Sequence, residues 1–254
     1  MKIAILPNYE EISREAAREI VTLVLQKPEA VLALPTGDTP RRVYSLLVNY
    51  AQQGLVTFEK TTVFNLDEYL GLSRDHPLSF WNYMQKHFLA FVQVGKHYIP
   101  DSETQDPQGE CERYENLIAK AGGFDLVVLG LGVNGHIAFN EPGTPFESRT
   151  HVAILAPETR LRLAVDFGGI ELVPAKAITV GIRTIMNARA ILLLACGKEK
   201  AEGLYKALFG PVHPQLPASV LQLHPKVTVL TDHDAASTFM DRQQRPASPQ
   251  YMYV

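Results

Sequence analysis

The sequence from 130 to 143 reads Gly130-Leu-Gly-Val-Asn-Gly-His-Ile-Ala-Phe-Asn-Glu-Pro-Gly143 and follows an apolar run from Asp125 to Leu129. An apolar run that ends in glycines is typical of a buried strand followed by an open turn, where α/β proteins place their chemistry. Glycine permits positive φ and lets a ligand approach the main chain. His136 can exchange a proton near neutral pH, and Glu141 lies near enough to orient it. Taken alone, the pattern is equally compatible with a plain tight turn.

Composition sets the background for this stretch. The chain has 254 residues and is 46% hydrophobic, which is enough to bury a substantial core. A net charge of -3 gives no electrostatic reason to expect nucleic acid or an anionic membrane as a partner. Two cysteines, Cys111 and Cys196, are too few for a disulfide framework. The apolar N-terminus is too short for a signal peptide and no run approaches a membrane span, so we expect a cytoplasmic protein.

Apolar runs of strand length alternate with amphipathic stretches along the chain. We expect strands at 2–6, 30–34, 61–66, 125–131, 177–180, 191–196 and 227–231, and helices at 9–26, 41–53, 106–121, 198–209 and 218–223. This alternation predicts an α/β fold with a Rossmann-like, doubly wound, mostly parallel sheet and helices on both faces. No linker divides the chain. We therefore predict a single domain over residues 1–235 and a loosely held polar tail over 236–254.

The end of the second expected strand, Leu34-Pro-Thr-Gly-Asp-Thr-Pro40, is a candidate phosphate site. Main-chain N–H groups of Gly37, Asp38 and Thr39, with the positive end of the next helix, would suit an anion. An ordinary helix cap at Thr39 and Pro40 is the alternative. The Asp38 carboxylate would repel a phosphate unless only its main chain faces the site or it caps the helix. Lys200, at another junction of strand and helix, is a further candidate, although such a lysine is usually solvated.

The third expected strand stops on two adjacent carboxylates, Asp67 and Glu68. Successive side chains of a strand face opposite ways, so we do not expect the two to act as one unit. A carboxylate that is partly desolvated has a raised pKa and can serve as the base for a carbon-bound proton. A pair of solvated loop acids is the alternative.

His136, with Asn134 and Glu141, forms the third candidate, a base held by an orienting carboxylate. A metal site is not expected, because the eight histidines form neither H-x-H nor H-E-x-x-H and no cysteine lies at ligand spacing. A nucleophilic triad is not expected either, because the sequence has no G-x-S-x-G and neither cysteine falls in an expected loop.

Six collinear motifs together resemble the glucosamine-6-phosphate deaminases, and the resemblance runs from about residue 2 to residue 234. The motifs are Leu34-Pro-Thr-Gly-Asp-Thr-Pro40, Phe64-Asn-Leu-Asp-Glu-Tyr69, Gly132-Val-Asn-Gly-His-Ile-Ala-Phe-Asn-Glu-Pro142, Ser148-Arg-Thr150, Thr179-Val-Gly181 and Leu221-Gln-Leu-His-Pro-Lys226. The resemblance implies isomerisation of glucosamine 6-phosphate with hydrolytic loss of ammonia, giving fructose 6-phosphate. It implies no metal or organic cofactor.

The resemblance also assigns roles to particular positions of this chain. Asp67 matches the base that moves the C2 proton, and His136 matches the group that opens the sugar ring. Asn134 and Glu141 match the positions that orient that histidine. The main chain of 37–39 and the ammonium of Lys200 match the phosphate cradle.

Two positions depart from the pattern. Asp38 stands where the family usually has glycine or serine, and Val165 stands where many members have a phosphate-binding arginine. Arg162 lies one helical turn before Val165, so it could replace that arginine.

His151 and Ala153 stand where the regulated hexameric members have basic effector-binding side chains. We therefore expect a monomer or small homo-oligomer without that regulation.

Two other functions remain open from the sequence. Phosphogluconolactonases share the architecture, but their equivalent segment usually reads D-G-H-T-A-S-L-F-P, whereas this chain has Asn140-Glu-Pro142. A sugar-phosphate sensor without catalytic activity would need a DNA-reading module and would not need both Asp67 and His136.

Overall fold

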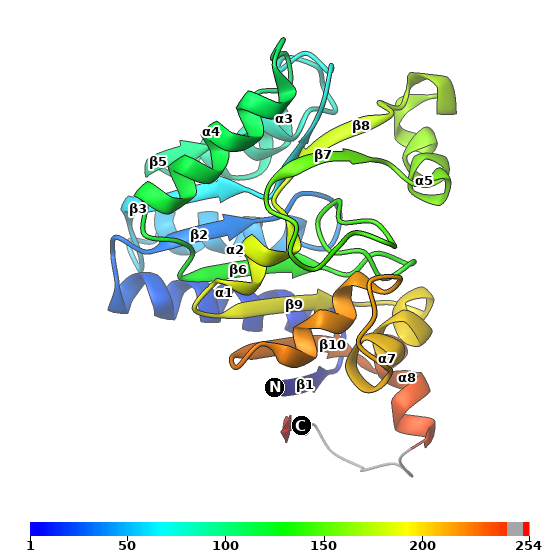
Figure 1. Ribbon diagram of the computed structural model, residues 1–254. Helices are drawn as coiled ribbons and strands as arrows, with labels where there is room; N and C mark the ends of the chain where they lie inside the picture. The colour runs from blue at the N-terminus through cyan, green and yellow to red at the C-terminus, as the bar shows by residue number, and fades with distance from the viewer. Residues whose placement is uncertain (243–250, 254) are drawn as a thin grey trace.

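An eight-stranded sheet with helices on both faces forms the body of the computed structural model, which describes residues 1–242 and 251–253 (Figure 1). The strand order is β11-β1-β10-β9-β6-β2-β3-β5. All neighbours pair in parallel except β11, which is antiparallel to β1. The strands are β1 (Lys2–Leu6), β2 (Val31–Leu34), β3 (Phe58–Asn65), β5 (Val94–Tyr98), β6 (Leu126–Gly130), β9 (Ile191–Ala195), β10 (Val227–Asp232) and β11 (Tyr251–Tyr253). The expected Rossmann-like α/β fold is thus confirmed.

The chain reverses its direction across the sheet between β2 and β6. From β2 it runs outward through β3 to β5, returns to β6, and then runs the other way through β9 and β10. In a doubly wound sheet, the loops at such a switch point separate and leave a crevice beyond the carboxyl ends of the strands. The loops after β2 and β6 flank this switch point, and the loops after β3 and β9 lie next to them at the same edge of the sheet.

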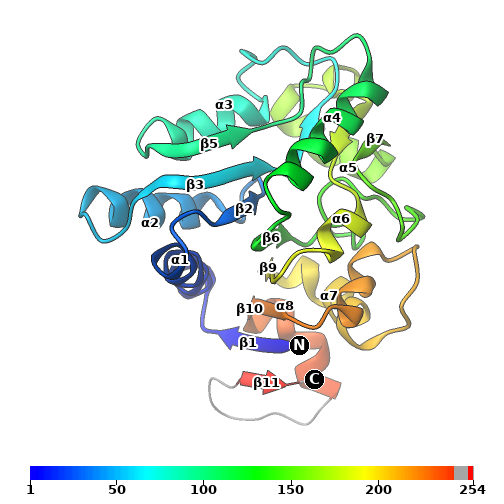
Figure 2. The same cartoon turned by 60° about the vertical axis from the view of Figure 1, so that its left-hand side comes forward.

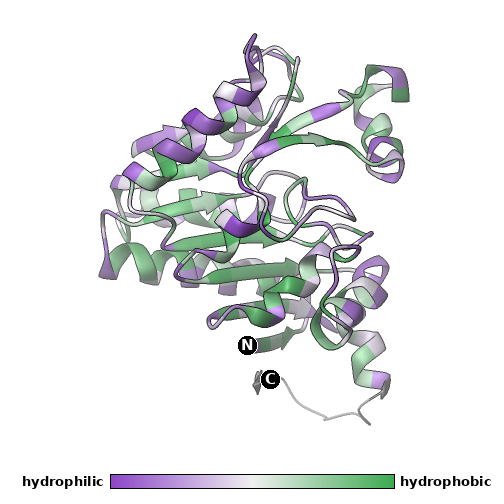
Figure 3. Cartoon of the chain, viewed as in Figure 1, coloured by the Kyte–Doolittle hydropathy of each residue, from purple (hydrophilic) through white to green (hydrophobic). Residues whose placement is uncertain are grey.

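The helices divide between the two faces of the sheet (Figure 2). One face carries α1 (Tyr9–Gln26), α2 (Arg41–Gln52), α3 (Phe80–Met84) and the π-helix η1 (Gln85–Leu89), and the other carries α4 (Pro107–Lys120), α6 (Ile182–Met186), α7 (Ala201–Phe209), η4 (Pro217–Leu223) and α8 (His233–Arg242). In α1 the buried Ile12, Ala16, Ile20 and Val24 recur every four residues, which turns one apolar stripe toward the strands. The central strands are green in Figure 3 because they are covered by helices on both sides.

A second, antiparallel sheet lies beyond the carboxyl ends of the main strands (Figure 1). It consists of β4 (Asp67–Tyr69), β8 (Lys176–Thr179) and β7 (His151–Ile154), in the order β4-β8-β7. The connection from β7 to β8 holds α5 (Pro157–Phe167) and η2 (Ile170–Leu172). We expected residues 177–180 to belong to the main sheet, which is wrong, because β8 pairs with β4 and β7 instead.

The expectation of a loose tail from residue 236 is wrong for residues 236–242. These residues continue α8, in which Ala235, Ala236 and Phe239 are buried in the core. Residues 251–253 form β11 beside β1. The remainder of the expected tail, 243–250 and 254, lies outside the described residues. Over the described part of the chain, no helix has the length and apolar character needed to cross a membrane.

Candidate active site

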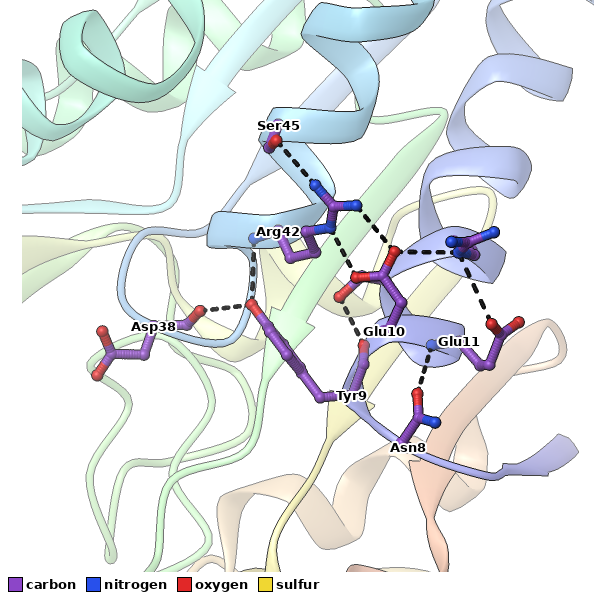
Figure 4. Close-up of polar contacts among 9 residues, drawn as sticks. Asn8, Tyr9, Glu10, Glu11, Asp38, Arg42 and Ser45 are labelled. Carbon is purple, nitrogen blue, oxygen red and sulfur yellow. Dashed lines mark hydrogen bonds and ion pairs between the residues drawn. The ribbon is translucent and has the colours of Figure 1, made fainter.

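The loop after β2 presents main-chain N–H groups toward the carboxyl edge of the sheet. Gly37 has φ of 98°, which favours glycine. Its carbonyl accepts a hydrogen bond from the Tyr83 hydroxyl at 2.6 Å, and the Asp38 carbonyl accepts one from the Tyr9 hydroxyl at 3.0 Å (Figure 4). Within the described part of the chain, the N–H groups of 37–39 donate to no protein acceptor. Two tyrosines thus hold the carbonyls while the amides stay available to an anion.

The Asp38 side chain is turned to solvent and does not enter this loop. It is 75% exposed and pairs with Arg41 at 2.8 Å, so the main chain alone can face a ligand. The cap residue of α2 is Pro40, and no side chain of the described residues caps this helix. The alternative that Thr39 or Asp38 serves as a helix cap is therefore wrong.

Lys200 lies at the same carboxyl edge of the sheet, on η3 (Lys198–Lys200), which follows β9. Its side chain is buried. Burial lowers the pKa of its ammonium, and the positive charge of Arg162 lowers this pKa further. Among the described residues, no carboxylate forms an ion pair with Lys200. A buried cation is costly without a partner, so this position suits an anionic ligand. Arg162 on α5 is exposed and lies within electrostatic reach of Lys200, whereas Val165 is 84% exposed.

Cys196 follows β9, which ends at Ala195, so its expected position inside a strand is wrong. Burial raises the pKa of the Cys196 thiol, and the nearby Thr39 side chain opposes this rise. The loop after β2 and the loop after β9 therefore lie next to each other.

Asp67 and Glu68 on β4 have different environments, as expected for neighbouring side chains that face opposite sides of a strand. Asp67 is buried, pairs through its backbone with Thr179 of β8, and has no side-chain hydrogen bond within the described residues. Burial, with a smaller contribution from Glu68, raises the pKa of Asp67 to about 8. Such a carboxylate is a strong base for its type.

Glu68 instead accepts hydrogen bonds from three backbone N–H groups, those of Tyr69, Phe80 and Trp81. Burial raises the pKa of Glu68 to about 7 against the effect of these donors. The side chain thereby ties the start of α3 to β4. Its role in the fold is structural.

His136, Asn134 and Glu141 meet in the loop after β6. The His136 Nδ1 lies 3.4 Å from Glu141 Oε2 and off the line of a hydrogen bond, so the contact is electrostatic. Asn134 Nδ2 donates to the same carboxylate oxygen at 2.9 Å, and Asn134 Oδ1 accepts from the His136 N–H at 3.2 Å. A Cβ on Gly132 would lie 2.5 Å from the imidazole, so this glycine makes room for the ring.

Glu141 also binds α5, a contact that the sequence did not reveal. Thr159 Oγ1 donates to Glu141 Oε1 at 2.6 Å and the Ala156 N–H donates to the same atom at 3.3 Å. Burial would raise the pKa of Glu141, but His136, Thr159 and Asn134 together lower it to about 2. A threonine in the first turn of a helix has no sequence signal for this role, because its partner lies 18 residues away.

The loop that holds His136 is joined to the strand that holds Asp67 through β8. The Phe139 N–H donates to Thr179 Oγ1 at 3.1 Å, and Asn140 Nδ2 donates to the Val180 carbonyl at 2.9 Å. The Val180 N–H donates to the Leu66 carbonyl at 2.8 Å. These bonds fix the two proton-transfer candidates on one scaffold. Within the described residues, no group of His, Cys, Asp or Glu side chains has the arrangement needed to hold a metal ion.

We predict that Asp67→Asn makes the protein more stable than the wild type at alkaline pH. An aspartate has a pKa near 3.9 when unfolded and one of about 8 here, so the folded state loses stability as pH rises between these values. One pKa unit corresponds to about 1.4 kcal/mol, and we expect the variant to gain about 1 kcal/mol or more at pH 9 relative to pH 4. Urea unfolding of both proteins at pH 4, 6 and 9 measures this difference. Parallel pH profiles would contradict the prediction.

Known proteins resemble this chain both in sequence and in fold. The family described as glucosamine-6-phosphate isomerases/6-phosphogluconolactonase matches residues 8–230. A glucosamine-6-phosphate deaminase of Bacillus velezensis is 48% identical over 238 residues, which are 93% of this chain and 99% of the relative. The solved structure of a monomeric glucosamine-6-phosphate deaminase has a TM-score of 0.90 at 46% identity and covers 93% of this chain and 99% of its own. A 6-phosphogluconolactonase from Trypanosoma brucei shares the fold, with a TM-score of 0.76 at 22% identity, over 93% of this chain and 97% of its own. The chain therefore belongs to the family of glucosamine-6-phosphate isomerases and 6-phosphogluconolactonases.

Proposed function

We propose that this chain is a glucosamine-6-phosphate deaminase, which converts glucosamine 6-phosphate and water to fructose 6-phosphate and ammonia. The observation that carries the proposal is the buried Asp67 carboxylate, which has no hydrogen-bond partner among the described residues. A base of this kind suits removal of a carbon-bound proton, which is the demanding step of an aldose-ketose isomerisation. Relatives at 44–48% identity with this name support the assignment.

Binding would begin at the sugar phosphate. The free N–H groups of Gly37 to Thr39 and the buried ammonium of Lys200 suit the phosphate dianion. Arg162, whose charge already acts on Lys200, is the cation that would replace the arginine missing at Val165. The Asp38 carboxylate points to solvent and would not oppose this binding.

Ring opening would be the task of His136. The imidazole would accept the proton of the O1 hydroxyl and donate a proton to the ring oxygen, so that the C1–O5 bond breaks and an open-chain aldose forms. Glu141, with a pKa of about 2, would stay ionised during this step and would stabilise the positive charge that the His136 imidazole gains. Asn134 fixes the Glu141 carboxylate and the main chain of His136.

Isomerisation would then use Asp67. The carboxylate would take the proton from C2 while O1 gains a proton, which gives an enolamine with a double bond between C1 and C2. It would then deliver a proton to C1 as the nitrogen loses one, which leaves an imine at C2. Water adds to this imine, and ammonia leaves with the C2–N bond pair. None of these steps requires a metal or an organic cofactor.

A lactonase is the second candidate, because the family includes both activities. Hydrolysis of a lactone transfers no carbon-bound proton, so it would leave the buried Asp67 without a task. We therefore prefer the deaminase. We further propose that the enzyme acts as a monomer in cytoplasmic amino-sugar catabolism, in keeping with the monomeric relative.

The proposal is tested by incubating the protein with glucosamine 6-phosphate, galactosamine 6-phosphate and 6-phosphogluconolactone while ammonia and ketose 6-phosphate are followed. We expect ammonia from glucosamine 6-phosphate, and solvent deuterium at C1 of the product. Asp67→Asn keeps the side-chain shape but cannot take the proton, so its kcat should fall by about 10²–10⁴-fold or more with little change in binding. Activity within a few-fold of the wild type would remove Asp67 from the mechanism. Turnover of the lactone alone would favour the second candidate.

We predict that His136 and Glu141 act as one unit in ring opening. His136→Gln, Glu141→Gln and the double variant should therefore lose similar factors in kcat, because residues that act together are not additive. Steady-state kinetics of the three variants measures this coupling. If the losses multiply instead, Glu141 has only a structural role.

We predict that Lys200 and Arg162 share the phosphate. Lys200→Ala should raise KM sharply and Arg162→Ala should raise it comparably, because each removes a charge-assisted contact of about 1.5–3 kcal/mol. Arg160→Ala on the same helix is the matched control, since its guanidinium is committed to the Ile170 and Val173 carbonyls. An unchanged KM in Arg162→Ala would show that this side chain does not reach the substrate.

A further inference from the structure

A groove of about 540 Å³ lies between α2 and η1, at the surface of the helices that cover one face of the sheet and outside the candidate active site. One of its ends is lined by cationic and titratable side chains, namely Arg41, Arg42, Lys86 and His87. Among the described residues, no carboxylate lines it. Cavities of this size hold small organic ligands.

The secondary structure gathers these side chains. Arg41, Ser45, Asn49 and Gln52 recur at intervals of three or four residues and so share one face of α2. Lys86 and His87 come from η1, which is a π-helix. π-Helical segments are rare in proteins, and those that occur often lie at functional sites. Two separate elements thus contribute positive charge to one end of the groove.

The charges at this end are only partly neutralised. Arg42 is paired with Glu10 and Arg41 with Asp38 (Figure 4 shows the Arg42 contacts), whereas Lys86 has no acidic partner within the described residues. Burial lowers the pKa of His87, and the neighbouring Arg41 and Lys86 lower it further, as expected where positive charges crowd together. A bound anion would relieve this repulsion and add charge-assisted hydrogen bonds.

The opposite end of the groove has a different character. Asn49 and Gln52 line the groove from the last turns of α2, where Asn49 Oδ1 accepts a hydrogen bond from Gln53. Phe91, two residues beyond η1, also lines the groove and is 54% exposed. An exposed aromatic ring beside side-chain amides suits a flat heteroaromatic ring, which can stack on the phenyl face and accept or donate hydrogen bonds. A ligand that fits both ends therefore carries a phosphate and a flat polar ring.

We propose that this groove binds a nucleoside phosphate, with its phosphate at Arg41, Lys86 and His87 and its base on Phe91. The groove is connected to the candidate active site. Arg41 holds Asp38, and the His87 ring lies 4.5 Å from the ring of Tyr83, whose hydroxyl binds the Gly37 carbonyl. The phosphate would compete with Asp38 for Arg41, so occupancy of the groove and the loop at 37–39 would affect each other.

Isothermal titration calorimetry at about 50 mM salt tests the proposal, because surface charges are weakly screened there. The ligands are adenosine 5′-monophosphate, inorganic phosphate and adenosine. We expect the nucleotide to bind with a dissociation constant below about 1 mM, inorganic phosphate to bind more weakly, and adenosine to bind least. Failure of the nucleotide to bind would overturn the proposal.

Variants locate the binding. Lys86→Ala should weaken nucleotide binding by roughly tenfold or more, whereas Lys120→Ala, which removes an exposed lysine from α4 on the other face, should not change it. Phe91→Ala should abolish the advantage of the nucleotide over inorganic phosphate. Equal effects of the two lysine variants would overturn the assignment to the groove.

A further pair of variants separates the groove from the candidate active site. Binding should persist in Lys200→Ala, which impairs the proposed phosphate site. Asp38→Ala releases Arg41 and should tighten nucleotide binding several-fold. Loss of binding in Lys200→Ala with retention in Lys86→Ala would place the nucleotide in the active site instead. All these readouts are binding measurements, so they stand or fall separately from the deaminase activity.

Discussion

The carboxylate of Glu141 joins three segments that are distant in the sequence. It lies beside the His136 ring, accepts a hydrogen bond from Asn134, and receives Thr159 and the Ala156 N–H from the start of α5. His136, Thr159 and Asn134 together lower its pKa to about 2 although burial acts in the opposite direction. The charge is therefore permanent at any physiological pH. Because one ionised group serves both the imidazole and α5, the orientation of His136 is coupled to the position of the helix that carries Arg162.

Asp67 and Glu141 have similar side-chain chemistry and are driven to opposite ends of the pKa range by their surroundings. Both are buried, which raises the pKa of each, but only Glu141 has donors that favour the ionised form. Asp67 has no hydrogen-bond partner among the described residues, and the neighbouring Glu68 adds repulsion. Acid and base roles at one site commonly arise from environments that separate the pKa values of two groups. The ionised form of the Asp67 carboxylate on β4 is destabilised by its surroundings, and the same destabilisation makes it a stronger base.

Local patterns predicted six of the eight strands of the main sheet and the loops that follow β2, β3, β6 and β9, because a parallel strand is buried on both faces and its end is marked by a change in composition. Asp67, His136 and Lys200 each follow such a strand. The edge strands β5 (Val94–Tyr98) and β11 were not predicted. The second sheet was not predicted, because β4, β7 and β8 have only three or four residues each and nothing local tells to which sheet a short apolar run belongs. The Thr159 contact and the burial of α8 depend on tertiary packing, which periodicity does not report. The outward turn of Asp38 likewise depends on Arg41, and the sequence left that orientation open.

The position of Asp38 shows how a carboxylate can be tolerated beside a phosphate cradle. Its side chain is 75% exposed and its partner Arg41 is 56% exposed, and ion pairs between exposed groups contribute only about 0–1 kcal/mol. Such a pair keeps the carboxylate away from the loop without fixing it strongly. Arg41 can therefore exchange Asp38 for a stronger anionic partner in the neighbouring groove at little cost. A loop of main-chain donors held from outside by Tyr9, Tyr83 and Arg41 is for this reason sensitive to what binds on the outer face of α2.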